Sequence, residues 1–221
     1  MKRAFKSILL VLVVLIGLGV GLGYWSARTP PSWFKPPAAS EAVKERGWTV
    51  ESRLAEEFSK IRTEQPIWGV RVTEDDLNAW LADRLRPWVE HRGAWPEEIG
   101  AVQVRLAEGR VGLAVELVDL GSVAVLEAEP VASSEDGSVT LRWTSAGFGR
   151  LRVPWPDARV RDAVLGRLLA EEGGKVELAA LLDGLSLPGF IDLPDGRRVS
   201  LLEATIGDGE AVLGFVTAPR E

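Results

Sequence analysis

One apolar stretch near the N-terminus constrains this chain more than any other feature. From Ser7 to Trp25 the sequence carries no charge and consists almost entirely of apolar residues. An α-helix rises about 1.5 Å per residue, so about 20 such residues cross the hydrocarbon core of a bilayer. The pattern therefore predicts a transmembrane helix that ends in the headgroup layer. The residues that we expect to hold this anchor are Ile8, Leu12, Leu15 and Trp25.

A cleaved signal peptide is the competing interpretation of this stretch. Its apolar core is usually about 7–15 residues long and is followed by small residues at the cleavage site. Here the run is longer, and a cut after Ala27 would place the bulky Trp25 where a small side chain is favoured. We therefore predict that residues 1–27 stay attached as a cytoplasmic tip and anchor. The basic residues in front of the run favour a cytoplasmic N-terminus, with the main domain in the periplasm or the extracellular space.

Four glycines in the stretch, at positions 17, 19, 21 and 23, form two overlapping small-x-x-x-small pairs. Such pairs let two membrane helices approach closely, so the anchor could form a homodimer. Glycine is also frequent in membrane helices in general, and this simpler explanation stays open.

The charge of the chain beyond the anchor limits its partners. Only four of the 26 basic residues lie at or before residue 28, which leaves 22 against 32 acidic residues and a net charge of about −10. Such an acidic body repels nucleic acid and anionic lipid headgroups, so we expect no nucleic-acid partner. The chain has no cysteine, which excludes disulfides, thiolate nucleophiles and cysteine-ligated metals. We also expect no cofactor.

Two segments are expected between the anchor and the main domain. Residues 28–40 contain four prolines and predict a short, stiff, extended spacer off the membrane. Residues 41–65 predict an amphipathic helix because apolar residues recur at steps of three or four. We expect Gly47 to interrupt this helix early. Its apolar stripe consists of Val50, Leu54, Phe58 and Ile61.

The main domain, residues 66–221, opens with a strand over 67–72 and a capped helix. Thr73 precedes an acidic turn and is followed three residues later by Asp76. In this arrangement, a capping box, the hydroxyl and the carboxylate bond the free N–H groups at the start of a helix. Asn78 lies on the same helix, and we expect its side chain to bond a neighbouring strand and fix the angle of the helix.

From about residue 100 the apolar period changes from about 3.6 to 2, which predicts strands. Short turns such as Pro194-Asp195-Gly196 separate them, so neighbouring strands pair antiparallel. We predict four strands up to residue 143 and a glycine-interrupted one ending before Pro154. Helical patterns follow over 157–169 and 178–182, and the last strands are expected at 187–193, 199–206 and 211–217. The predicted fold class is therefore α+β: an antiparallel sheet of about seven strands with helices packed on one face.

Three features of the chain together resemble the YpmS-like family of membrane-anchored bacterial proteins. They are the N-terminal anchor, the strand-then-helix sequence VRVTEDDLNAWLADRL over residues 70–85, and the order of strands around the GFGRLRVP run. The similarity covers the chain from about Pro66 onward. The helical segment before it and the many tryptophans are departures. The resemblance implies a single-pass protein with its domain outside the cytoplasm, and it carries over no catalytic residue.

The ionisable residues offer little for catalysis. His91 is the only histidine, so an ordinary structural zinc site lacks ligands, and we expect this residue at the surface. Glu74, Asp75 and Asp76 could serve as an acid–base pair or bind calcium, but their position at a helix N-terminus already explains them. We therefore predict no catalytic, cofactor-binding or metal-binding residues.

The one-sided sheet and the nine tryptophans lead to a hypothesis about function. We expect most of the tryptophans to be packing residues. The leading hypothesis is a non-catalytic binding or scaffold module in envelope maintenance or secretion, with an apolar groove for a lipid-like ligand or an envelope protein. The alternative is a carboxylate-based hydrolase of envelope polysaccharide, which needs two acidic side chains facing each other at about 5–10 Å.

Overall fold

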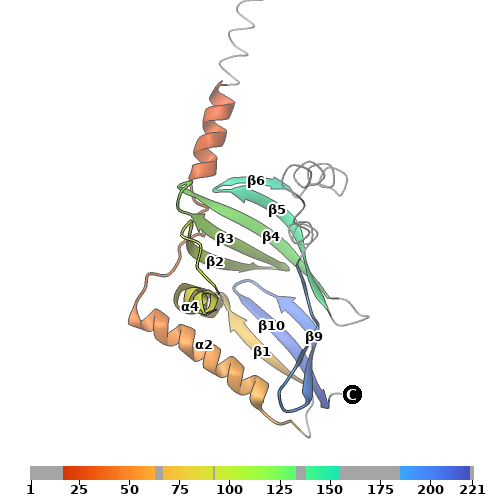
Figure 1. Ribbon diagram of the computed structural model, residues 1–221. Coiled ribbons are helices and arrows are strands. Elements are labelled where there is room, and N and C mark those ends of the chain that lie inside the picture. The colour runs from red at the N-terminus through yellow and green to blue at the C-terminus, as the bar shows by residue number, and fades with distance from the viewer. Residues whose placement is uncertain (1–16, 63–66, 92, 133–137, 155–184, 220–221) are drawn as a thin grey trace, which may run out of the picture.

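The protein is built from two antiparallel sheets and a group of helices (Figure 1). The computed structural model describes residues 17–62, 67–91, 93–132, 138–154 and 185–219. Within these residues the α+β class and the antiparallel pairing of the strands are confirmed. The expected single sheet of about seven strands is wrong, because the strands divide into sheets of four and six.

Sheet A is the four-stranded sheet. Its strands lie in the order β1 (Ile67–Thr73), β10 (Glu210–Pro219), β9 (Arg197–Ile206) and β8 (Phe190–Asp192). The first strand of the domain therefore pairs with the last one, since Ile67 lies opposite Val216 and Thr73 opposite Glu210. This pairing closes the domain between its two ends.

Sheet B follows the chain more simply. Its strands are β2 (Ile99–Ala107), β3 (Arg110–Leu117), β4 (Ser122–Ala132), β5 (Val139–Phe148) and β6 (Leu151–Pro154), with β7 (Leu185–Leu187) also paired to β5. The strand expected over 187–193 is therefore wrong, because β7 belongs to sheet B and β8 to sheet A. Pro188 and Gly189 lie between them, and a proline without an N–H followed by a glycine interrupts a strand ladder.

The two sheets meet through the tips of two hairpins. The Gly109 N–H donates to the Ile206 carbonyl oxygen at 2.9 Å, and the Gly209 N–H donates to the Leu106 carbonyl oxygen at 3.0 Å. Both glycines have positive φ, 71° and 76°, which tight turns require and other residues rarely adopt. These reciprocal bonds hold the β2–β3 turn against the β9–β10 turn.

Three helices and a π-helical turn lie beside sheet A. They are α2 (Glu41–Ser59), α3 (Glu74–Trp80), the π-helical turn η1 (Leu81–Leu85) and α4 (Arg86–Glu90). The expected interruption of α2 at Gly47 is wrong, because the helix continues through this residue. A Cβ at Gly47 would lie 3.0 Å from the Ala79 carbonyl oxygen, so glycine allows α2 to approach α3. Ile61 lies beyond the end of α2 and is 78% exposed.

The apolar core is divided between the sheets. In sheet A, Val70, Val72, Val199 and Phe215 are buried, and Leu54 and Phe58 of α2 and Leu77 of α3 pack against them. In sheet B, the buried residues are Ala114, Val123 and Val125, and Trp33 and Phe34 pack against them. The segment expected to be a spacer off the membrane thus lies partly against sheet B.

The N-terminal segment is described from residue 17 onward. Residues 17–28 are helical and extend away from sheet B (Figure 1). Within the described residues, no helix is long and apolar enough to cross a bilayer. Ile8, Leu12 and Leu15 lie outside the described residues, and so do the helices expected over 157–169 and 178–182. Trp25 lies on the described helix and is 63% exposed.

Candidate functional site

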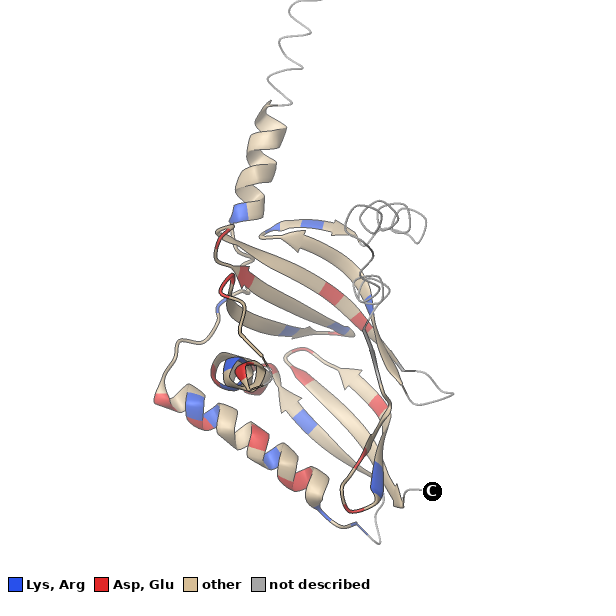
Figure 2. Cartoon of the chain, viewed as in Figure 1, with Lys and Arg blue, Asp and Glu red and all other residues tan. Residues whose placement is uncertain are grey.

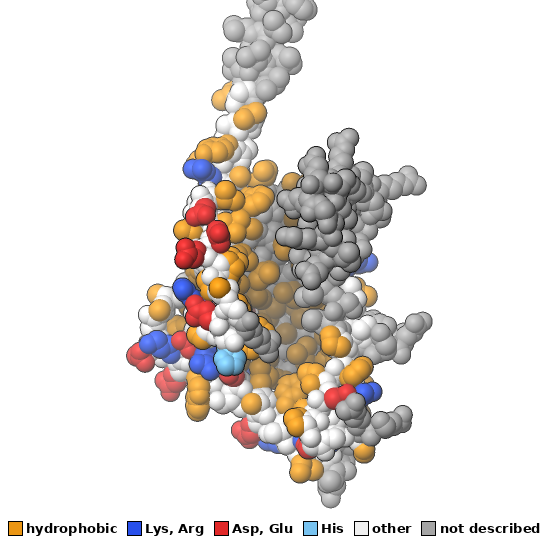
Figure 3. Space-filling model, viewed as in Figure 1, with side chains coloured by type: hydrophobic (Ala, Val, Ile, Leu, Met, Phe, Trp, Pro, Cys, Tyr) orange, Lys and Arg blue, Asp and Glu red, His pale blue; other side chains and the backbone are white. Residues whose placement is uncertain are grey.

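An apolar cavity of about 260 Å³ lies between the two sheets. Strands β8, β9 and β10 form one wall, and β3, β4 and β5 form the other. Among the described residues that line it, none is charged. Figure 3 shows a hollowed face on which apolar side chains gather. The wall from sheet A includes Phe190, Val199, Leu201, Leu213 and Phe215, and the wall from sheet B includes Val111, Pro130, Val139 and Leu141.

A β-bulge in β9 shapes the wall from sheet A. Gly214 pairs with Glu203, but the next residue, Phe215, pairs with Leu201. Leu202 is therefore an extra residue in its strand, and it is 51% exposed. Because successive side chains of a strand alternate between faces, the extra residue allows both Leu201 and Ala204 to line the cavity.

An aromatic cluster supports one side of the cavity. The Phe215 ring stacks on Trp68 with centroids 4.8 Å apart, and the Phe58 ring meets both edge-on at 5.3–5.4 Å. The Trp68 indole N–H donates to the Thr217 hydroxyl at 2.9 Å, and Arg62 lies over the other ring system at 4.0 Å from its centroid. The polar atom of Trp68 is thus satisfied while its rings are packed. The packing role predicted for the tryptophans is confirmed for this one.

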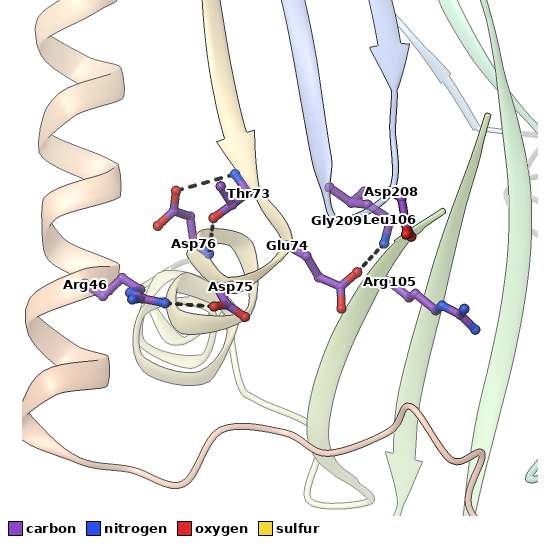
Figure 4. Close-up of a pocket in the computed structure, with 9 residues that line it drawn as sticks. All are labelled: Arg46, Thr73, Glu74, Asp75, Asp76, Arg105, Leu106, Asp208 and Gly209. Atoms are coloured by element: carbon purple, nitrogen blue, oxygen red, sulfur yellow. Dashed lines mark hydrogen bonds and ion pairs between the residues drawn. The ribbon is translucent and has the colours of Figure 1, made fainter. Parts of the chain in front are cut away.

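A second, polar cavity of about 710 Å³ opens beside the start of α3 (Figure 4). Here the predicted capping box is present: the Asp76 N–H donates to the Thr73 hydroxyl at 3.1 Å, and the Thr73 N–H donates to the Asp76 carboxylate. Asp75 forms an ion pair with Arg46 of α2 at 3.2 Å. Two of the three acidic residues considered for acid–base or calcium chemistry therefore bind groups of the protein.

The third acidic residue and Asn78 join α3 to β2. The Glu74 carboxylate accepts a hydrogen bond from the Leu106 N–H at 2.7 Å. The Asn78 side chain accepts from the Val104 N–H at 2.8 Å and donates to the Val104 carbonyl oxygen at 2.9 Å. Because β2 is an edge strand, these bonds satisfy backbone groups that no further strand pairs. The predicted structural role of Asn78 is confirmed.

The remaining candidates for chemistry lie apart from both cavities. His91 is exposed in the turn after α4. Within the described part of the chain, no group of three or more histidine, aspartate and glutamate residues could hold a metal ion. Trp48 and Trp88 are 61% and 49% exposed, so these two differ from Trp68, and Trp155 lies outside the described residues.

The sequence did not reveal the residues that form the cavity. The alternation of apolar residues in β3, β5 and β9 predicted an apolar face for each strand, but it did not predict that faces of two sheets oppose each other. The Pro188-Gly189 interruption was the available signal that the chain changes sheets at this point.

Comparisons with known proteins identify no relative of this chain: no protein-family model, curated protein or solved structure matches it. The resemblance to the YpmS-like family therefore stays a prediction, and the geometry carries the functional argument.

Proposed function

We propose that this protein is a membrane-anchored module that binds the acyl chain of a lipid in the cavity between its two sheets. Its main domain lies outside the cytoplasm. The composition of the cavity walls carries the proposal: aliphatic and aromatic side chains from both sheets, and no charged residue among the described ones. An acyl chain that enters such a cavity leaves water, which is the main driving force for apolar binding.

The size of the cavity limits how much of a lipid it can hold. Its volume of about 260 Å³ lies just below the range of about 300–1,000 Å³ that is usual for ligand pockets. It therefore holds part of one chain while the polar headgroup stays in solvent. Each methylene removed from water contributes about 0.8 kcal/mol, or about fourfold in affinity. Affinity should therefore rise with chain length and level off once the cavity is full.

Photo-crosslinking in the native membrane tests this proposal. Benzoylphenylalanine is placed at Leu141, in the wall from sheet B, and the irradiated protein is examined by mass spectrometry for an added lipid. The matched control is the same group at Thr205, which is exposed and lies between two cavity-lining residues of β9, so that it faces away. A lipid adduct at Leu141 but not at Thr205 supports the proposal. No lipid adduct at Leu141, or equal adducts at both positions, overturns it.

A cavity-filling variant links the adduct to the cavity. Ala204→Trp adds a large side chain to the wall from sheet A and is expected to abolish the adduct at Leu141. Thr205→Trp adds the same group on the opposite face of β9 and should leave the adduct unchanged. Circular dichroism shows whether each variant is folded. Titration of intrinsic tryptophan fluorescence with medium-chain fatty acids should give the chain-length dependence in the Thr205 variant and a flat response in the Ala204 variant.

The compartment is tested separately. The chain has no cysteine, so a single introduced cysteine is the only thiol in the protein. Thr205→Cys is expected to react with a membrane-impermeant maleimide added to intact spheroplasts, and Lys2→Cys is expected to react only after lysis. The reverse pattern would show that the main domain faces the cytoplasm.

A further inference from the structure

The helix of residues 17–28 ends directly on two turns of sheet B. The Ala27 carbonyl oxygen accepts a hydrogen bond from the Ser122 hydroxyl at 2.6 Å, next to the turn between β3 and β4. The Ser26 carbonyl oxygen accepts from the Arg150 N–H at 2.9 Å, in the turn between β5 and β6. The guanidinium of Arg150 also donates to the Pro30 carbonyl oxygen at 3.3 Å. The end of the helix is therefore held against the domain with no free spacer between them.

Gly149 makes this close contact possible. Its φ is +56°, and a Cβ at this position would lie 2.5 Å from the carbonyl oxygens of both Ala27 and Thr29. A larger residue would push the helix away from the β5–β6 turn. The backbone of residues 26–30 is thus fitted to this end of sheet B (Figure 1).

Exposed apolar side chains gather at the same end. Val118 and Leu120 lie in the β3–β4 turn, and Phe148 and Leu151 flank the β5–β6 turn. These four side chains are between 43% and 56% exposed. Exposed apolar residues that are scattered singly need no explanation, but four on two neighbouring turns beside an apolar helix form a patch.

Basic residues accompany this patch although the domain as a whole is acidic. Arg28 and Arg150 are both exposed, and Arg28 also lies over the Tyr24 ring at 4.8 Å from its centroid. Asp119 is the acidic residue in the β3–β4 turn. Apolar side chains flanked by arginine and aromatic residues match the headgroup layer of a bilayer, where rings and guanidinium groups contact the interface.

We propose that the patch formed by Val118, Leu120, Phe148 and Leu151 is a membrane-contact surface. These side chains enter the headgroup layer around the N-terminal helix, and Arg28 and Arg150 contact lipid phosphates. The surface fixes the orientation of the domain on the bilayer. This inference rests on the anchor in the proposed function, because the helix must continue into the membrane for the patch to meet it.

Depth measurements on the full-length protein test the inference. Single-cysteine variants carry a spin label in vesicles of phosphatidylethanolamine and phosphatidylglycerol, and accessibility to oxygen and to a water-soluble nickel complex gives the depth. Leu120→Cys and Phe148→Cys report on the patch, and Val14→Cys reports on the anchor. Ile61→Cys is the control, because it is exposed and apolar but lies past α2, away from the helix (Figure 1).

The expected result is a label in the hydrocarbon at residue 14, labels in the headgroup layer at 120 and 148, and a label in water at 61. If residue 14 is deep while 120 and 148 match the control, the contact surface is wrong and the anchor stands. If residue 14 is itself in water, the anchor fails, and the proposed function fails with it. Protection at 120 and 148 that varies with protein-to-lipid ratio would assign the patch to a second copy of the chain and overturn the inference.

Discussion

The two sheets use the same antiparallel pairing but differ in what covers their apolar faces. The strands of sheet A pack against α2 and α3, and their core contains the stacked rings of Phe215 and Trp68. Sheet B has only Trp33 and Phe34 packed on its buried cluster, and its other face contributes a wall of the cavity. The comparison assigns different tasks to the two halves: sheet A supplies most of the packing energy, and sheet B keeps apolar surface available for a ligand.

The largest expected effect comes from breaking the aromatic cluster of sheet A. Phe215→Ala removes a ring that is 8% exposed and contacts Phe58 and Trp68. Substitutions of this kind cost about 3–5 kcal/mol, and we expect the lower end because one side of the ring borders the cavity. Urea unfolding measures the loss in free energy of unfolding.

Leu141→Ala is the matched variant in sheet B. Leu141 is half-buried and faces the same cavity, so we expect a loss of only about 1–2 kcal/mol, below the usual range for buried leucines. An equal loss in the two variants would contradict the proposed division of tasks between the sheets.

The second prediction concerns the joint between the helices and sheet B. Asn78→Leu removes both hydrogen bonds to Val104 and leaves its N–H and carbonyl groups without partners in a largely buried position. Each such loss costs about 1–3 kcal/mol where water cannot replace the bond, so we expect about 2–3 kcal/mol in total. Amide hydrogen exchange should also become faster at Val104. Unchanged protection of that amide would show that the side chain does not hold β2.

Local signals made part of this architecture predictable from the sequence. The capping box of Thr73 and Asp76 and the contact of Asn78 follow from residue types at fixed positions on one helix. The alternation of apolar residues predicted antiparallel strands for the same reason. The division into two sheets was not predictable in this way, because it depends on β1 pairing with β10 at the other end of the domain.

Glycine shows why the remaining features needed the structure. Gly47 carries a helix-breaking signal in the sequence, but its position against Ala79 makes it a contact residue within an intact helix. The same holds for the cavity: the sequence shows that Val139 and Val199 are apolar, while only the packing of the sheets shows that they share a wall-to-wall space.

The third prediction tests the contact between α2 and α3. Alanine favours a helix over glycine by about 1 kcal/mol, so Gly47→Ala would stabilise an isolated helix. In the protein, the new methyl group would lie 3.0 Å from the Ala79 carbonyl oxygen and force the helices apart. We expect a net loss of about 1 kcal/mol in the free energy of unfolding. Thr49→Ala, at an exposed position of the same helix, is the control and should be neutral or slightly stabilising. A stabilising Gly47→Ala would show that the two helices can separate without cost.

The smallest expected effect concerns the charges that run along α2 (Figure 2). The hydrogen bond from Arg84 lowers the pKa of Glu51, and this pair at 2.7 Å connects α2 to η1. A carboxyl group with a lowered pKa stabilises the folded state above its ordinary pKa, and this contribution is lost as the pH falls through the folded-state pKa. Both side chains are well exposed, so solvent screening keeps the contribution of the pair below about 0.5 kcal/mol.

Glu51→Gln should therefore be slightly less stable than the natural protein at neutral pH. The difference should disappear as the pH falls well below about 4.3, the ordinary pKa of a glutamate, because the natural side chain is then also uncharged. Urea unfolding at both pH values measures the difference. Glu45→Gln is the control on the same helix, because the described residues show no ion pair at Glu45, and it should have no effect at either pH. A difference for Glu51→Gln that persists in acid would mean that the shape of this side chain, and not its charge, holds α2 to η1.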